Sequence, residues 1–175
     1  FYMQKVLGVE QPRVGLANIG TEKTKGGPLQ LEAYGLMEAS SYHFIGNVEA
    51  RDVPFGACDV LVADGFTGNM LLKMYEGVAG AMMANIKGIF KQNAITKLSA
   101  LMIKNGLMDF KKRMDYTEFG GAPLLGISKP VIKAHGSSNA KAFCSAIRQA
   151  KQFSETGVIE NIANAVTKSA QASEA

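Results

Sequence analysis

Residues 58–73 read CDVLVADGFTGNMLLK, and this stretch decides the fold class. Four apolar residues in a row, Val60 to Ala63, are typical of a strand buried on both faces of a parallel sheet. Asp64-Gly65 marks the carboxyl end of that strand, and apolar residues at helical spacing begin directly behind it. A buried strand that runs straight into a helix indicates an α/β fold.

The segments on the N-terminal side repeat this alternation. Residues 12–20, PRVGLANIG, form another short apolar run that ends in glycine. Residues 28–40 have apolar side chains at helical spacing, and a second β-like run over residues 42–47 is expected to end at Gly46-Asn47. A long helix is predicted from about residue 67 to residue 91. Three glycines in it lower the helix propensity and suggest close helix contacts: Gly77, Gly80 and Gly88.

Residues 93–114 differ in character, because apolar stripes alternate there with lysines. They predict a pair of amphipathic helices that Asn105-Gly106 splits and that project from the sheet. Two more strands and two closing helices are expected behind them, within residues 116–126, 130–138, 138–153 and 157–170. Residues 1–175 are therefore interpreted as one α/β domain with a helical protrusion.

Composition limits the function classes. The chain of 175 residues is 47% hydrophobic and 19% charged, and none of its apolar runs approaches the ~20 residues that a membrane-spanning helix needs. Its net charge of +4 suits anionic small molecules or an acidic protein better than nucleic acid. Cys58 and Cys144 lack CxxC spacing, so we expect reduced thiols without a metal site. The start at Phe1, with Gly8 as a helix cap, suggests that upstream sequence is missing.

Four motifs resemble, in order, the core motifs of the PlsX family of phosphate acyltransferases. They are FIGNVEARDVP, DVLVADGFTGNMLLK, DYTEFGGAPLLGI and VIKAHGSSNAKA, which begin at residues 44, 59, 115 and 131. The resemblance extends from NIGTEKTKG at residues 18–26 to the last helices, and it includes polar loop residues that composition alone does not dictate.

The resemblance implies a doubly wound, three-layer α/β/α fold like that of isocitrate dehydrogenases and phosphotransacetylases, and a homodimer. It implies a cytoplasmic enzyme without cofactor or metal that transfers an acyl group from acyl carrier protein to inorganic phosphate, producing acyl phosphate for phospholipid synthesis. Residues 1–175 would be the C-terminal portion of the family. The protrusion at residues 93–114 suits an anionic membrane, beside a membrane glycerol-phosphate acyltransferase, or a partner subunit, and both remain open. Acidic acyl carrier protein would dock on the lysines.

Such a transfer needs positioning and positive charge rather than a protein nucleophile. The junction of residues 64–69 has free amides at a helix start, which suit phosphate or the acyl carbonyl. Asn69 is the expected oxyanion donor there, although simple helix capping with Thr67 is an alternative, and Asp64 could serve only to orient the loop. The substrate-binding residues predicted at this junction are Asp64, Gly65, Thr67 and Gly68.

Two further groups of residues are candidates. Lys25 and Gly26 follow the first strand and are expected to face phosphate, the alternative being a solvated lysine. Lys133 and His135 lie on one face of a strand by alternation, and the strand runs into Gly136-Ser137, an anion-binding or capping turn. His135 is expected to act either as a neutral acceptor or as a charged donor, with a structural histidine as the alternative.

Two other functions compete with this one. An enzyme of the phosphotransacetylase type would share the fold but use acyl-CoA as its donor. A non-catalytic scaffold at the membrane would bind lipid without acyl transfer. A nicotinamide enzyme is disfavoured, because no GxGxxG motif follows a strand.

Overall fold

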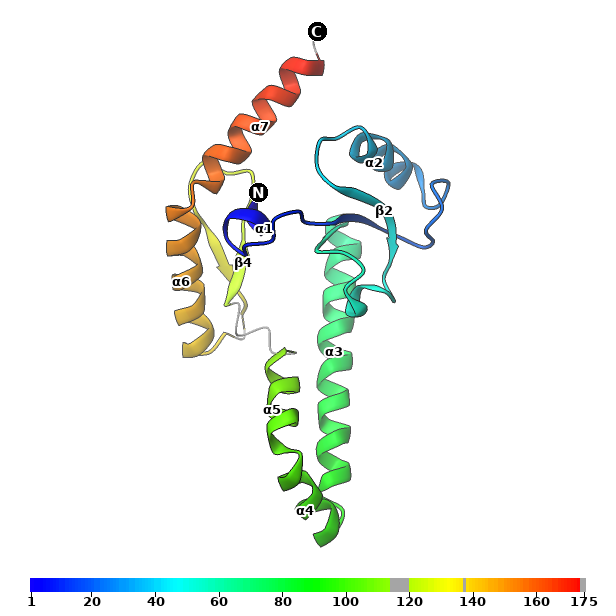
Figure 1. Cartoon of the computed structure of the whole chain (residues 1–175), viewed down its shortest axis with the longest axis vertical. Helices are drawn as coiled ribbons and strands as arrows, with labels where there is room; N and C mark the ends of the chain where they lie inside the picture. Colours follow the sequence, from blue (N-terminus) through cyan, green and yellow to red (C-terminus); the bar gives the residue numbers. More distant parts are fainter. Residues whose placement is uncertain (114–119, 137, 174–175) are drawn as a thin grey trace. The chain divides into compact units, whose positions relative to one another are not determined.

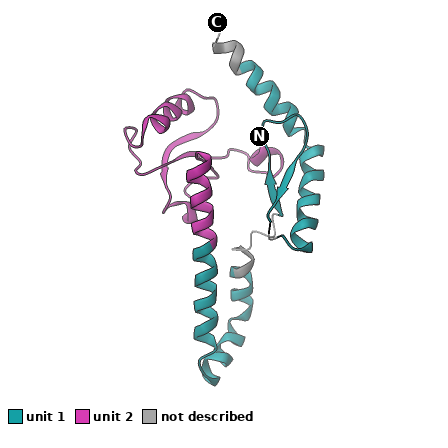
Figure 2. Cartoon of the chain, turned by 180° about the vertical axis from the view of Figure 1, so that it is seen from behind, with its two compact units in different colours: residues 1, 77–175 teal, residues 2–76 magenta. Residues whose placement is uncertain are grey.

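The computed structural model describes residues 1–113, 120–136 and 138–173, which form a mixed α/β structure with two separate sheets (Figure 1). Residues Tyr2–Glu76 form one compact unit, and Gly77–Ala175 with Phe1 form the other (Figure 2). Helix α3, Gly65–Phe90, runs from the first unit into the second. The predicted α/β class is confirmed.

The first unit contains a parallel three-stranded sheet in the order β2-β1-β3. Its elements are α1 Tyr2–Lys5, β1 Val14–Asn18, α2 Pro28–Glu38, β2 Phe44–Glu49, the 3-10 helix η1 Val53–Phe55 and β3 Val60–Val62. Leu16, Ala17, Met37 and Val48 are buried in its core. The strand, helix and strand alternation was therefore predicted correctly.

Strand β2 does not end at Gly46-Asn47 as expected, but continues to Glu49. Val14 pairs with Phe44 and Leu16 pairs with Asn47, so β2 has one residue more than β1 in this interval. Gly46 has a φ of 90°, a conformation that favours glycine and is typical of a β-bulge. The glycine thus bends the strand instead of ending it, and Asn47 becomes a buried strand residue.

The second unit contains an antiparallel pair of strands, β4 Gly121–Pro123 and β5 Ile132–Ala134. Helix α6, Ala140–Glu155, packs on both strands through buried Ala142, Ser145 and Ala146. Phe153 and Val158 are almost fully buried where α6 is followed by α7, Val158–Ser173. Both closing helices were predicted. The cap of α6 is Asn139, beyond the predicted Gly136-Ser137 turn, and its side chain accepts from the Ala142 amide at 2.9 Å.

Helices α4, Ala94–Met102, and α5, Lys104–Arg113, form the predicted amphipathic pair. They are split at Ile103, not at Asn105-Gly106. Asn105 and Gly106 lie in the first turn of α5, where backbone amides need no partner within the helix, so a poor helix former is tolerated there. Several apolar side chains of this pair are exposed in the described structure, including Ile95, Leu98, Leu101 and Met102.

An open groove of about 710 Å³ lies between α3, α4 and α5 within the second unit. Apolar side chains such as Met83, Ile86 and Phe90 line it together with Lys87, Lys91 and Lys97. Across the described ranges, no helix is both long and apolar enough to cross a bilayer.

Candidate functional site

The carboxyl edge of the parallel sheet holds two of the predicted groups of site residues. Because β1 and β3 are parallel neighbours, the loop after β1 and the junction after β3 leave the sheet at the same edge. The first loop, residues 19–27, carries Lys25 and Gly26. The second junction begins α3 and carries residues 64–69. The topology therefore places both groups at one edge of one unit.

The loop after β1, residues 19–27, is held by two asparagine side chains of the sheet. Asn18 Nδ2 donates to the Lys25 carbonyl at 3.0 Å and to Asn47 Oδ1 at 3.1 Å. Asn47 Nδ2 donates to the Glu22 carbonyl at 2.8 Å. Asn18 Oδ1 accepts from the Ile19 amide at 2.8 Å. The path of the loop is thus defined by side-chain bonds to its own backbone.

Lys25 lies on the exposed side of this loop. Its Nζ is 3.7 Å from Glu22 Oε1, and the two side chains are 44% and 62% exposed. A pair this exposed contributes little stability, so an anion could replace the carboxylate at low cost. The following Gly26 has a φ of 93° and leads into α2.

The start of α2 has no side-chain cap. Gly27 occupies the cap position, and Gln30 Oε1 accepts from the Gly27 amide at 3.0 Å. Pro28, which has no amide hydrogen, fills the first helical position. The positive end of the α2 dipole therefore lies one residue beyond Gly26 and close in sequence to Lys25.

A second contact fixes the outer side of the loop. Lys23 Nζ donates to Glu38 Oε1 near the end of α2. The same Nζ lies 5.7 Å from the centre of the Tyr34 ring, which meets Phe44 edge to face at 5.1 Å. The loop is therefore tied to both α2 and the sheet.

The start of α3 is capped by Asp64. Asp64 Oδ1 accepts from the Phe66 amide at 3.0 Å and the Thr67 amide at 2.9 Å. Hydrogen bonds from Thr67 are the main reason why the pKa of Asp64 lies below its usual value. These amides consequently have an anionic partner already, which favours a neutral acceptor over a phosphate at this point. Asn69 is exposed in the following turn, and Gly65 and Gly68 are in the first turn.

The third predicted group lies in the second unit. Lys133 lies in β5 and His135 follows it; both are exposed, whereas Ile132 and Ala134 are half-buried. This alternation agrees with Lys133 and His135 on one face of the strand. The His135 carbonyl accepts from the Ser138 amide at 3.0 Å, so a turn encloses exposed Gly136. Ser137 lies outside the described residues.

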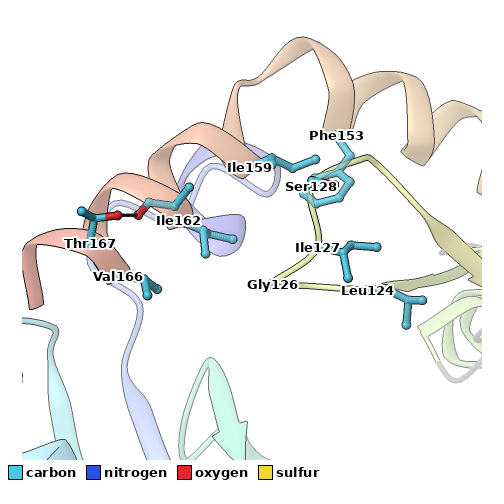
Figure 3. Close-up of a pocket in the computed structure, with 10 residues that line it drawn as sticks. Leu124, Gly126, Ile127, Ser128, Phe153, Ile159, Ile162, Val166 and Thr167 are labelled. Atoms are coloured by element: carbon cyan, nitrogen blue, oxygen red, sulfur yellow. Dashed lines mark hydrogen bonds between the residues drawn. The ribbon is translucent and has the colours of Figure 1, made fainter. Parts of the chain in front are cut away.

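An apolar pocket of about 390 Å³ lies in the second unit, with Ile159 and Ile162 of α7 on one side and Leu124 and Ile127 on the other (Figure 3). Thr167 also lines it, but its hydroxyl donates to the Ala163 carbonyl of its own helix at 2.9 Å. None of the predicted site residues that the structure describes lines the pocket. Within the described ranges, no group of three or more His, Cys, Asp or Glu side chains is arranged to hold a metal.

Sequence reasoning missed Asn18 and the buried position of Asn47 as parts of this edge. In sequence, Asn18 belongs to an apolar run and begins the segment NIGTEKTKG, and Asn47 is the expected end of β2 within the motif FIGNVEARDVP, but neither is predicted as a site residue. The sequence signal that could have indicated Asn18 as a site residue is its position as the last, polar residue of a buried strand, directly before a glycine-rich loop. The pairing of Asn18 with Asn47 depends on the register of β1 with β2, which the bulge at Gly46 shifts.

Comparison with known proteins identifies relatives over most of the chain. A family model described as fatty acid synthesis protein matches residues 1–161. The phosphate acyltransferase of Lysinibacillus sphaericus is 54% identical over 165 residues, which cover 94% of this chain and 50% of that protein. That of Thermoanaerobacter pseudethanolicus is 52% identical over 92% of this chain and 48% of its own length. That of Brevibacillus brevis is 52% identical over 95% of this chain and 50% of its own length. The chain spans about half the length of these relatives.

Proposed function

Because the chain belongs to the fatty acid synthesis protein family, the PlsX family that its motifs resemble, we propose that the complete protein is a phosphate acyltransferase. It transfers an acyl group from acyl carrier protein to inorganic phosphate and releases acyl phosphate for phospholipid synthesis. The observation that carries this proposal is the identity of about half of all residues, over more than nine-tenths of the chain, to relatives named phosphate acyltransferase.

The reaction uses phosphate itself as the nucleophile. A phosphate oxygen attacks the thioester carbonyl carbon, the carbon–sulfur bond breaks, and the thiolate leaves and takes up a proton. Protein groups must then hold the dianion and stabilise the oxyanion of the tetrahedral intermediate. The exposed Lys25 and the uncapped start of α2 support phosphate binding at the loop of residues 19–27, with Gly26 allowing close approach of the backbone.

The start of α3 is proposed to bind the acyl carbonyl. Asp64 already supplies negative charge to the Phe66 and Thr67 amides, so a second anion there would be repelled. A carbonyl oxygen carries no full charge until the transition state, when Asn69 would donate to it. Gly65 and Gly68 keep side chains out of the way of the thioester.

Lys133 and His135 are proposed to act on the donor side of the reaction. Their exposure on one face of β5 supports contact with a bound substrate, and Gly136 and Ser137 would contribute backbone donors. His135 in its charged form would give a proton to the leaving thiolate, and Lys133 would stabilise the sulfur before protonation.

The complete protein is proposed to have a doubly wound α/β/α fold, to form a homodimer and to work in the cytoplasm, in peripheral contact with the membrane. Residues 1–175 would be its C-terminal portion, with residues 93–114 as the protrusion. The lysines and exposed apolar side chains of α4 and α5 support contact with an anionic membrane, near a membrane glycerol-phosphate acyltransferase, or with the partner subunit. Acyl carrier protein is acidic and would dock on lysines.

The test is formation of acyl phosphate by the complete protein from labelled phosphate, with acyl carrier protein and acyl-CoA as alternative donors. We expect turnover with the acylated carrier protein, and a decrease of more than about tenfold in Lys25→Ala and in Asn69→Ala, each with an unchanged melting temperature. Preference for acyl-CoA would indicate an enzyme of the phosphotransacetylase type. Lipid binding without any transfer would indicate a scaffold.

A further inference from the structure

Two asparagines on neighbouring strands form a pair at the carboxyl edge of the parallel sheet. Asn18 is the last residue of β1, and Asn47 lies within β2. Asn18 Nδ2 donates to Asn47 Oδ1 at 3.1 Å, and Asn47 is only 6% exposed. Both side chains thus meet on the side of the sheet edge that faces the loop of residues 19–27.

The pair binds the backbone of this loop at its start, middle and end. Asn18 Oδ1 accepts from the Ile19 amide at 2.8 Å. Asn47 Nδ2 donates to the Glu22 carbonyl at 2.8 Å, and Asn18 Nδ2 donates to the Lys25 carbonyl at 3.0 Å. The last of these bonds ends on the backbone of the lysine itself.

The chain is also shaped around the pair. A Cβ atom on Gly26 would lie 2.9 Å from Asn18 Oδ1 and 2.7 Å from Gln30 Cβ, and the φ of 93° disfavours any other residue. Most surface loops leave their carbonyls to water. Burial of a side-chain amide costs free energy unless it is hydrogen-bonded. Loop conformations that lack these hydrogen bonds are therefore disfavoured relative to the one observed.

We propose that Asn18 and Asn47 are positioning residues of the phosphate site. They hold the backbone that carries Lys25 and leads into α2 in the conformation that receives the dianion, and they do not touch phosphate themselves. This inference rests on the proposed function. Preorganisation of this kind lowers the entropy lost on binding, so its loss raises the KM for phosphate and leaves the KM for the acyl donor unchanged.

The first experiment compares Asn47→Ala with Asp59→Asn in the complete protein. Asp59 accepts three hydrogen bonds from Arg13 at the opposite edge of the same sheet, so its substitution destabilises the unit without touching the loop. Asn47→Ala removes the hydrogen bond that Asn47 donates to the Glu22 carbonyl and the one that it accepts from Asn18. We therefore expect the KM for phosphate to rise about tenfold or more in Asn47→Ala and to stay constant in Asp59→Asn. Equal changes in both variants, or in the KM for both substrates, would assign the pair a merely structural role.

The second experiment uses Asn47→Asp and pH. At pH 8 its carboxylate faces the Glu22 carbonyl and repels it, so the KM for phosphate rises. Burial raises the pKa of an aspartic acid at this position, and the protonated form donates to the carbonyl as the amide does. We therefore expect the KM ratio between Asn47→Asp and wild type to fall as the pH is lowered, while the ratio for Asn47→Ala stays constant. A KM for phosphate in Asn47→Asp that equals the wild-type value at pH 8 would overturn the proposal.

A third measurement separates this inference from the proposed function and applies even where a variant has no turnover. Hydrogen exchange of the backbone amides of residues 19–27 is expected to accelerate in Asn18→Ala and in Asn47→Ala, and not in Asp59→Asn. The double variant should change by less than the sum of the two single variants, since the hydrogen bond between the two side chains is lost in each. If the loop amides of both single variants exchange as slowly as those of the wild type, the positioning role is refuted. If the wild type shows no acyl transfer and its loop amides exchange rapidly, both proposals are contradicted.

Discussion

At the scale of single residues, the described structure contains one dense cluster away from the proposed site. Arg13 donates through Nε and Nη2 to both carboxylate oxygens of Asp59, and its backbone amide donates to Asp59 Oδ2 at 2.7 Å. Nη1 and Nη2 also donate to the carbonyls of Ala57 and Gly56. The cluster joins the start of β1 to the start of β3, and the side-chain hydrogen bond from Arg13 is the main reason why the pKa of Asp59 falls to about 2.

This pKa predicts an acid-sensitive contribution to stability. The folded pKa of about 2 lies below the usual value of 3.8 for an aspartic acid, so the contribution is fully present well above pH 4 and is lost as the pH falls towards 2. We expect the melting temperature of the wild type to fall more steeply between pH 4 and pH 2 than that of Asp59→Asn, which has no carboxylate to protonate. Thermal unfolding of both proteins across this range is the measurement, and parallel curves would contradict the prediction.

At the scale of elements, the contact between β4 and α6 depends on a glycine. Gly120 precedes β4 with a φ of 79°, and a Cβ atom there would lie 2.2 Å from the Ala146 nitrogen and 2.6 Å from the Ser145 carbonyl carbon. Both are backbone atoms of α6, so they cannot rotate away as a side chain would. Gly120→Ala is expected to destabilise the protein by about 2 kcal/mol or more, through strain and loss of this packing.

Gly126→Ala is the matched control for that prediction. Gly126 has the same φ of 79°, but a Cβ atom there has no heavy atom within 4 Å in the described structure. It isolates the cost of the backbone conformation, which is about 1 kcal/mol. Chemical denaturation of both variants measures the difference, and an equal loss of stability would show that α6 yields to the added methyl group.

The glycines of α3 test whether the exposed face of this helix is covered in the complete protein. In the described structure a Cβ atom at Gly88 would have no heavy atom within 4 Å, so the close helix contacts expected from sequence are not made here. Gly88→Ala should then stabilise the protein by about 0.5–1 kcal/mol, and Ala81→Gly should destabilise it by a similar amount. A loss of stability in Gly88→Ala of the complete protein would instead reveal a neighbour that packs on this glycine.

The elements could be predicted because their signals are local. The run from Val60 to Ala63 and the helical spacing behind it depend only on neighbouring residues, and β3 and α3 follow them closely. The bulge at Gly46 could not be predicted, since a glycine that ends a strand and one that bends it look alike in sequence. The same holds for the site: Lys25 and Asn69 stood out by their loops, whereas the Asn18–Asn47 pair exists only through the register of two strands.

At the scale of the whole molecule, the chain accounts for about half of the length of its relatives. Many apolar side chains are exposed among its described residues. Exposed apolar area of this extent usually marks a surface that something else covers. The exposed apolar side chains of α3 and α6 are proposed to pack against the remainder of the complete protein, because a doubly wound fold places helices on both faces of one sheet. Those of α4 and α5 are proposed to contact a membrane or a second subunit.

A substitution at the end of α4 distinguishes contact with a membrane from contact with a second subunit. Met102 is 83% exposed in the described structure, so Met102→Glu should leave the fold unchanged. Burial of a methionine side chain contributes about 1.5–3 kcal/mol, so the substitution should weaken the contact made there by about tenfold or more. Ser99→Glu on the same helix adds the same charge without loss of an apolar side chain, and should have a smaller effect.

Sedimentation with vesicles that contain anionic lipid measures the membrane contact, and light scattering of the complete protein measures the contact with the partner subunit. If Met102→Glu binds vesicles more weakly but remains a dimer, this end of α4 contacts the membrane. If Met102→Glu becomes a monomer, this end of α4 contacts the partner subunit. A variant that keeps both contacts would show that the exposed end of α4 takes part in neither.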